Sequence, residues 1–184
     1  FTYALIGGGG GGGHGFDGGA NGTPAPNGGT SSISGSGFST VSASGGTGGR
    51  SGYFHPGTDT TEKDGDASVY GAGGGRGPNT DPGPGYDAPS SSYGAGGGGG
   101  GGDMPNNKFD STGFAGEGGG ASTRVTGTIT VASGTTITVT IGAKGTGAPH
   151  GSYTGGDGAA GYATITANGV TTPFTSSGTI TLTG

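Results

Sequence analysis

The first thirteen residues read FTYALIGGGGGGG (residues 1–13) and join a short β-prone segment directly to seven glycines. A second run of seven glycines occupies residues 96–102, and glycine makes up 55 of the 184 residues. A residue without Cβ has no side chain to bury and loses the most backbone freedom on ordering. If these runs are ordered, contacts between backbones must hold them, and we expect the partners to be backbone groups of other glycine segments, in the same or a neighbouring copy.

The composition indicates a chain that associates with other copies of itself. Hydrophobic residues make up only 26% of the sequence. Ordering costs roughly 1–2 kcal/mol per residue in backbone entropy, so a single copy with so few apolar side chains has a marginal fold. We therefore expect an oligomer or polymer, with copies of the chain as the first partners, each copy being a single domain of residues 1–184.

Several classes of protein are excluded by the same composition. The net charge is −5 and the six Lys and Arg residues are scattered, which argues against nucleic acid as a partner. No cysteine is present, so disulfides and thiol catalysis are excluded. No stretch approaches the roughly 20 apolar residues of a membrane span. The sequence starts at Phe1 rather than Met, and we expect a processed product, a fragment or one unit of something longer.

The chain divides into three parts. Residues 1–6 form an N-terminal strand, residues 7–122 a long glycine-rich insertion, and residues 123–184 a region rich in Thr, Ile and Val that alternates with a period of two. Within this last part we expect strands at residues 123–131, 136–141, 161–167, 170–174 and 179–182. The predicted fold class is all-β, a Thr/Ile-rich meander or sandwich with essentially no helix.

Turn signals and repeats support this strand assignment. Asn168-Gly169 is the strongest hairpin signal, because a type I′ turn needs a positive φ at both positions. Pro173 indicates an edge strand or a strand end. The tripeptide Thr-Ile-Thr recurs four times, starting at residues 128, 136, 164 and 179, as suits the solvated face of a sheet.

The glycine insertion has two interpretations. Glycine-rich linkers behave as random coil. Alternatively, the runs form polyglycine II helices, with three residues per turn, which lie side by side and bond N–H to C=O between neighbours. Two observations favour order: the two runs are equally long, and the insertion contains nine aromatic residues. The insertion also contains YGAGGG twice, at residues 70–75 and 93–98, but no regular Gly-x-x period.

No catalytic, cofactor or metal site is predicted, and no enzyme is expected. Lys144 is followed by Gly145, so the P-loop pattern fails. The three histidines, His14, His55 and His150, are far apart. Residues 12–17 fit the opening of a calcium nonapeptide without a tandem copy, and the acidic residues 59–66 lack EF-hand spacing. Asn21 is a candidate glycosylation site, because it begins the sequon Asn-Gly-Thr.

Three segments carry a family resemblance: ALI running into the glycines of residues 7–13, SGTTITVTIGAKG (133–145) and GGDGAAGYATIT (155–166). With these motifs the chain resembles the glycine-rich domain found at the ends of phage tail-fibre proteins and on some bacterial surface proteins. The resemblance implies an extracellular, cell-surface or virion location and a role in fibre-tip structure, host-surface binding or both, without catalysis. No binding residue is transferred by it.

One departure from the family suggests how copies assemble. The segment FTSSGT (174–179) stands near the C-terminus, whereas the resemblance implies such a strand before the opening strand. Joining residues 179–184 of one copy to residues 1–6 of another would rebuild the family order. The candidate inter-subunit strand contacts are then Phe1, Tyr3, Leu5, Ile180 and Leu182. The alternative is that the same two segments pair within one chain.

Two functions remain open from the sequence. The first is a non-catalytic subunit of an extracellular fibre or filament, assembled by β-strand complementation between copies. The alternative is the adhesin tip of a phage tail fibre, trimeric, which recognises bacterial surface glycans or proteins. Ice binding, a third class, is disfavoured because the insertion lacks a regular Gly-x-x period.

Overall fold

The computed structural model describes residues 1–14, 24–50, 65, 67–74, 84–97, 116–149 and 154–183. These residues contain strands and extended segments and no helix, which confirms the all-β prediction. The strands are β1 (Thr2–Ile6), β2 (Ser31–Gly35), β3 (Phe38–Ala43), β4 (Val125–Thr128), β5 (Thr136–Thr140), β6 (Tyr162–Ala167), β7 (Val170–Phe174) and β8 (Gly178–Thr181).

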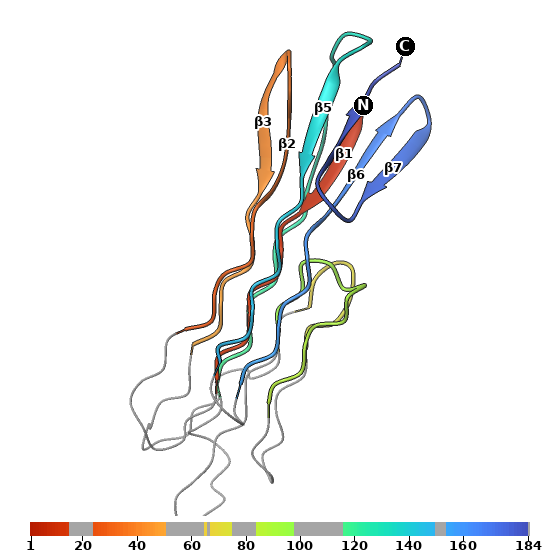
Figure 1. Ribbon diagram of the computed structural model, residues 1–184. Helices are drawn as coiled ribbons and strands as arrows, with labels where there is room; N and C mark the ends of the chain where they lie inside the picture. Colours follow the sequence, from red (N-terminus) through yellow and green to blue (C-terminus); the bar gives the residue numbers. More distant parts are fainter. Residues whose placement is uncertain are drawn as a thin grey trace, which may run out of the picture.

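Two antiparallel four-stranded sheets pack into a sandwich, in the orders β4-β1-β6-β7 and β3-β2-β5-β8 (Figure 1). Alternation of side chains builds the core: on β5, Ile137 and Val139 are buried, whereas the three threonines of that strand are exposed. Side chains of both sheets meet in one buried cluster formed by Leu5, Ile33, Ala43, Ile137, Val139, Ala163, Ile165 and Leu182.

The order of the strands differs from the predicted meander. Only the pairs β2–β3 and β6–β7 are hairpins, and every other connection crosses from one sheet to the other. Moreover, β2 and β3 lie inside the region assigned to the glycine insertion. The sequences of these two strands are rich in serine and therefore resemble a loop. Ile33 of β2 is nevertheless fully buried. One apolar side chain facing the core suffices because β2 hydrogen-bonds to strands on both sides.

The predicted turn and edge strand are both present. Asn168 and Gly169, between β6 and β7, have φ of 49° and 76°. Positive φ at both central positions is what a type I′ hairpin turn requires. β7, which contains Pro173, is an edge strand of its sheet.

Below the sandwich, the strands continue into extended glycine-rich segments that run side by side (Figure 1). Residues 7–13 continue β1, residues 44–50 continue β3 and residues 142–148 follow β5. Residues 24–29, 116–122 and 154–161 run the opposite way and lead into β2, β4 and β6. Together with residues 94–97, these segments form what we call the glycine bundle, with residues 7–13 as its central segment.

The N–H groups of the central segment show a period of three. Gly8 and Gly11 donate to residues 29 and 26, Gly9 and Gly12 to residues 159 and 156, and Gly10 and Gly13 to residues 120 and 117, over 2.8–3.1 Å. Every third donor thus reaches the same neighbour, and the partner's number falls as the donor's number rises. The central segment therefore donates to three antiparallel neighbours.

The carbonyl groups of the central segment point to three other neighbours. Gly8 and Gly11 accept from Gly46 and Gly49, and the carbonyls of Gly9 and Gly12 accept from residues 145 and 148. The carbonyl of Gly10 accepts from Gly97. These neighbours run parallel to the central segment, so it has six hydrogen-bonded neighbours in all.

The six neighbours also bond to one another and close a ring. The bonds that join successive segments are Gly28–Gly46, Gly120–Thr47, Gly119–Gly97, Ala159–Ala95, Gly158–Gly145 and Gly29–Ala143, each from N–H to C=O. A three-residue period and six neighbours are the features of packed polyglycine II helices, so the described glycine segments of the insertion are ordered and are not a random-coil linker. The two glycine runs are neighbours where described, through the bond from Gly97 to Gly10.

The close packing explains why glycine fills the centre. A Cβ on Gly10 would overlap the carbonyl oxygen of Thr47, and one on Gly11 would overlap that of Thr146. Side chains occur where a segment faces outward: in SGGTGGR (44–50), Ser44, Thr47 and Arg50 are exposed. This segment carries a local three-residue period that the sequence analysis did not recognise.

Two buried serines join the sandwich to the bundle. The Ser31 hydroxyl donates to the carbonyl of Ile6 over 2.7 Å and accepts from the N–H of Gly142 over 2.9 Å. The Ser122 hydroxyl donates to the carbonyl of Ser44 over 2.6 Å and accepts from the N–H of Gly7 over 2.8 Å. Side chains therefore supply some of the partners that we expected only from backbone groups.

Replacing Gly10 by Ala should destabilise the fold by about 3 kcal/mol, because the added methyl group meets backbone atoms that are hydrogen-bonded on all sides. Gly178→Ala is the matched control, since a Cβ there meets only the Phe174 ring at an ordinary 3.7 Å. Urea unfolding of both variants gives the two free energies. Equal losses in both would contradict the packing described for the central segment.

Candidate functional site

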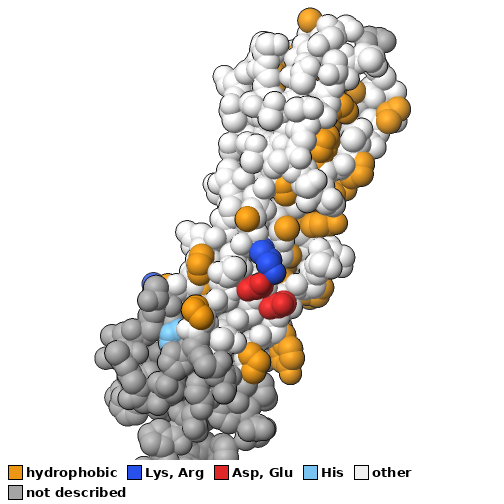
Figure 2. Space-filling model, in the orientation of Figure 1, with side chains coloured by type: hydrophobic (Ala, Val, Ile, Leu, Met, Phe, Trp, Pro, Cys, Tyr) orange, Lys and Arg blue, Asp and Glu red, His pale blue; other side chains and the backbone are white. Residues whose placement is uncertain are grey.

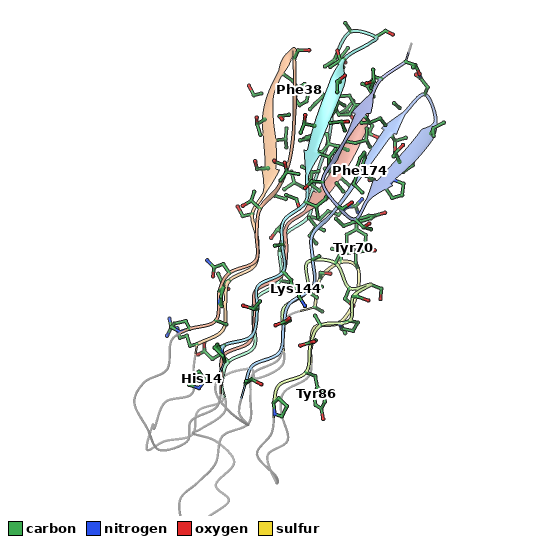
Figure 3. The ribbon with its side chains drawn as sticks, in the orientation of Figure 1. His14, Phe38, Tyr70, Tyr86, Lys144 and Phe174 are labelled. Carbon is green, nitrogen blue, oxygen red and sulfur yellow. The ribbon has the colours of Figure 1, made fainter. Side chains whose placement is uncertain are left out.

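The end of the glycine bundle that lies away from the sheets joins several segments (Figure 1). Gly13 of the central segment donates to Glu117, the N–H of Glu117 donates to the carbonyl of Arg50, and Gly12 accepts from Ala148. His14 and Tyr86 both lie near this end (Figure 3). The His14 side chain is 5% exposed, whereas that of Tyr86 is 62% exposed.

A charged cluster lies on the side of the bundle. The Lys144 ammonium contacts the Asp157 carboxylate at 2.6 Å, and the carboxylate of Asp87 accepts from the backbone N–H of Asp157 at 2.7 Å. Blue and red side chains meet there on a largely white surface (Figure 2). The cluster ties together residues 84–88, 142–148 and 154–161 of three different stretches of the chain.

The electrostatics keep Lys144 and Asp157 charged. The hydrogen bond from Lys144 to Asp157 raises the pKa of Lys144 despite its partial desolvation. Burial raises the pKa of Asp157, but the hydrogen bonds from Lys144 and from the Gly147 N–H outweigh burial, so that this pKa lies below its ordinary value. Lys144 and Asp157 thus form an ion pair that joins neighbouring segments of the bundle.

Three tyrosines pack together at the junction of sandwich and bundle. Tyr93 stacks on Tyr162 of β6 with ring centroids 4.5 Å apart, and Tyr70 meets both rings edge to face at 5.9 and 5.3 Å. Burial, with Tyr70 and Tyr93 nearby, raises the pKa of Tyr162. Tyr70 and Tyr93 begin the two YGAGGG copies, so the repeat noted in the sequence places two rings in one cluster.

The tyrosine cluster fixes residues 67–74 and 84–97 to the sandwich. The Ser68 hydroxyl donates to the Tyr93 carbonyl over 2.6 Å, and Ile6 of β1 is fully buried against Gly94. Gly94 adopts a positive φ of 76° there. The three rings pack against one another.

A cavity of about 200 Å³ opens at the opposite end of the molecule, beside both termini. Its walls come from Phe1, residues 130–133, Ala167, Asn168, Leu182 and Thr183. The backbone of Phe1 exchanges two 2.9 Å hydrogen bonds with Ile129, which continues the pairing of β1 with β4.

The five candidate contact residues lie in two different sheets. Phe1, Tyr3 and Leu5 belong to or adjoin β1, which is hydrogen-bonded to β4 on one side and to β6 on the other. Ile180 lies on β8, and Leu182 follows it in the core cluster. All five nevertheless meet in the core: Leu5 and Leu182 belong to the buried cluster, and Phe1, Tyr3 and Ile180 pack against it. Phe1 and Leu182 are also walls of the cavity.

The expected alternative pairing within one chain is wrong. β8 pairs with β5, and the backbone of Leu182 bonds to residues 134 and 135 rather than to β1. The physical reason is that β1 already has a partner on each side. A strand from another copy could reach β1 only by displacing β4 or β6.

Some predicted features fall outside the described residues: Asn21, His55, His150, most of the acidic residues 59–66 and residues 15–17 of the calcium-like motif. Within the part of the chain that the structure describes, no group of three or more His, Cys, Asp and Glu side chains could hold a metal ion. No helix in that part is long and apolar enough to cross a membrane.

Comparison with known proteins gives no match: no family model, no curated protein and no solved structure is similar to this chain. The candidate site therefore rests on the geometry of the bundle and its ends.

Replacing Asp157 by Asn should lower stability at neutral pH and have less effect in acid. The pKa of Asp157 is lowered in the folded state, so its contribution is present above the ordinary pKa of 3.8 and is lost as the pH falls through the lower folded value. Free energies of unfolding of both proteins, measured from pH 7 down to pH 2, test this. Parallel curves across the whole range would refute the role of the ion pair.

Replacing Tyr93 by Ala should loosen residues 67–74 and 84–94 without unfolding the sandwich. Two ring contacts are lost, at about 0.5–1.5 kcal/mol each, so amide exchange at Ser68 and Gly94 should quicken about tenfold. Tyr86→Ala is the control, because that side chain is exposed. Unchanged exchange in Tyr93→Ala would mean that the cluster does not hold these residues.

Proposed function

We propose that this chain is a non-catalytic binding tip of an extracellular fibre, on a virion or a cell surface, and that it recognises bacterial surface glycans or proteins. The observation that carries the proposal is the polarity of the molecule. Both termini lie at the sandwich end, while Gly13, Glu117 and Arg50, which are hydrogen-bonded in succession, lie at the other end of the bundle. Attachment through either terminus would leave the far end of the bundle free to meet a receptor.

The bundle suits the task of a stiff stalk. The central segment is bonded to six neighbours, so bending it would break backbone hydrogen bonds on several sides at once. Seven residues of such a helix span about 20 Å, at a rise of about 3.1 Å per residue. The stalk thus holds its far end at a fixed distance from the sandwich.

The sequence next to the described segments is rich in binding chemistry. Residues 51–64 (SGYFHPGTDTTEKD) follow Arg50 in the sequence and residues 98–115 (GGGGGDMPNNKFDSTGFA) follow Gly97, and both stretches concentrate aromatic, amide, carboxylate and hydroxyl side chains. Aromatic rings and hydrogen-bonding side chains are also what sugars and protein surfaces bind.

The binding experiment compares matched substitutions at the two ends. Tyr86→Ala near the bundle end and Val170→Ala at the sandwich end remove side chains that are 62% and 66% exposed. Fluorescently labelled protein is incubated with a panel of bacterial strains. Binding to at least one strain is expected, weakened in Tyr86→Ala and unchanged in Val170→Ala. No binding to any strain, or an equal loss in both variants, would argue against the proposal.

A second candidate, a subunit of a fibre or filament joined by strand addition between copies, is favoured by two observations. The edge strands β3, β4, β7 and β8 are each paired on one side only within the described sheets, so a partner strand has room to add. The cavity between Phe1 and Leu182 could receive an apolar side chain of that partner. Electron microscopy of the purified chain separates the candidates: filaments support this one, and discrete particles that bind cells support the tip.

A further inference from the structure

The outer surface of the glycine bundle poses a hydrogen-bonding problem. In a hexagonal array, each three-residue helix donates to three neighbours and accepts from three. The central segment has all six, but a ring segment has only the centre and two ring members beside it. Its remaining N–H and C=O groups point outward, toward positions where further helices of the same kind would fit.

On one side of the ring, the chain itself fills such outer positions. Gly85 donates to Thr154 and Ala88 donates to Asp157, both over 2.8 Å, so residues 84–88 lie outside residues 154–161. Gly74 donates to Gly96 over 2.9 Å, outside residues 94–97. The array therefore does accept additional segments beyond the ring.

At other outer positions, side chains take the place of a neighbouring helix. The Asn27 side-chain oxygen accepts from the N–H of Gly48 over 2.8 Å, and the Asp157 carboxylate accepts from the N–H of Gly147 over 2.8 Å. The Glu117 carboxylate accepts from the N–H of Arg50 at a longer 3.4 Å. In each case the acceptor comes from the adjoining segment and meets an outward donor.

We propose that Asn27, Glu117 and Asp157 terminate the glycine array and prevent a second copy from docking its own glycine segments there. An exposed row of backbone donors is a template for association, as at the edge of a sheet. Gly48 and Gly147 themselves cannot carry a protecting side chain, because a Cβ there would overlap the carbonyl oxygens of Ala25 and Gly155 in the adjoining segments. An oxygen on each outward donor removes the hydrogen bond that an incoming helix would make.

The surface that these side chains protect is defined by residues 24–29 and 44–50 on one side and residues 142–148 on another. The partner that it fits is a polyglycine II helix of a second copy, since the same backbone repeat is complementary to itself. This inference does not depend on what the far end of the bundle binds.

The test uses the whole chain and two variants of equal charge. N27A/E117A/D157A removes all three acceptors, and E117Q/D157N removes the same two negative charges but keeps side-chain oxygens at every position. Sedimentation velocity over a range of concentrations measures association. We expect at least a doubling of the average mass for the alanine variant relative to wild type and no change for the amide variant.

Two results would overturn the proposal. If neither variant associates more than the wild type, the side chains do not guard the surface. If both associate equally, charge repulsion rather than capping is responsible. If the triple variant does not fold, Asn27→Ala replaces it in the test, because this substitution changes only one exposed position. Its Gly48 amide should exchange faster and its average mass should rise with concentration, and an unchanged mass would equally refute the idea.

Discussion

A peptide segment that is hydrogen-bonded on six sides has no room for side chains, and this constraint governs the rest of the molecule. Residues 7–13 meet it because all seven are glycine. Each turn of three residues presents three N–H groups and three carbonyls, and each finds a different neighbour. In an ordinary core, hydrophobic side chains fill the space between segments. Here the backbone fills that space and packs against the carbonyl oxygens of the surrounding segments.

The sandwich supplies what the bundle lacks. Glycine helices carry no side chains that could specify which segment lies beside which, whereas β1, β3 and β5 arrive from sheets with a fixed strand order. Segments that run away from the sheets alternate around the ring with segments that run toward them. Ser31 and Ser122 lie where the two kinds of packing meet, and their hydroxyls bridge backbone groups that neither pattern pairs by itself.

The sequence predicts the parts of the structure in which side chains carry the pattern. The alternation in β5 and β6, the Asn168-Gly169 turn and the edge position of β7 follow from periodicity, turn chemistry and proline. β2 and β3 were not predicted because their serines resemble a loop and few of their residues, Ile33 and Ala43 among them, are buried apolar side chains. The hydrogen-bond partners of the central segment cannot be predicted from the sequence, because seven identical residues do not show which of them pairs with which neighbour. The spacing of Ser44, Thr47 and Arg50 in SGGTGGR (44–50) is the sequence signal that could have predicted the three-residue period. The role of Asn27, Glu117 and Asp157 could not be predicted, because it depends on which backbone N–H groups point outward.

The hydrogen bonds of the central segment also bear on how the chain folds. Gly7 bonds to Ser122, which is 115 residues away, and Gly12 bonds to Gly156. Contacts so distant in sequence form slowly, because the chain loses the entropy of closing a long loop before any hydrogen bond forms. A glycine chain alone has no apolar surface to draw such segments together. We therefore expect the sandwich, whose apolar side chains can draw distant strands together, to form first and to act as a template from which the bundle grows, one three-residue turn after another.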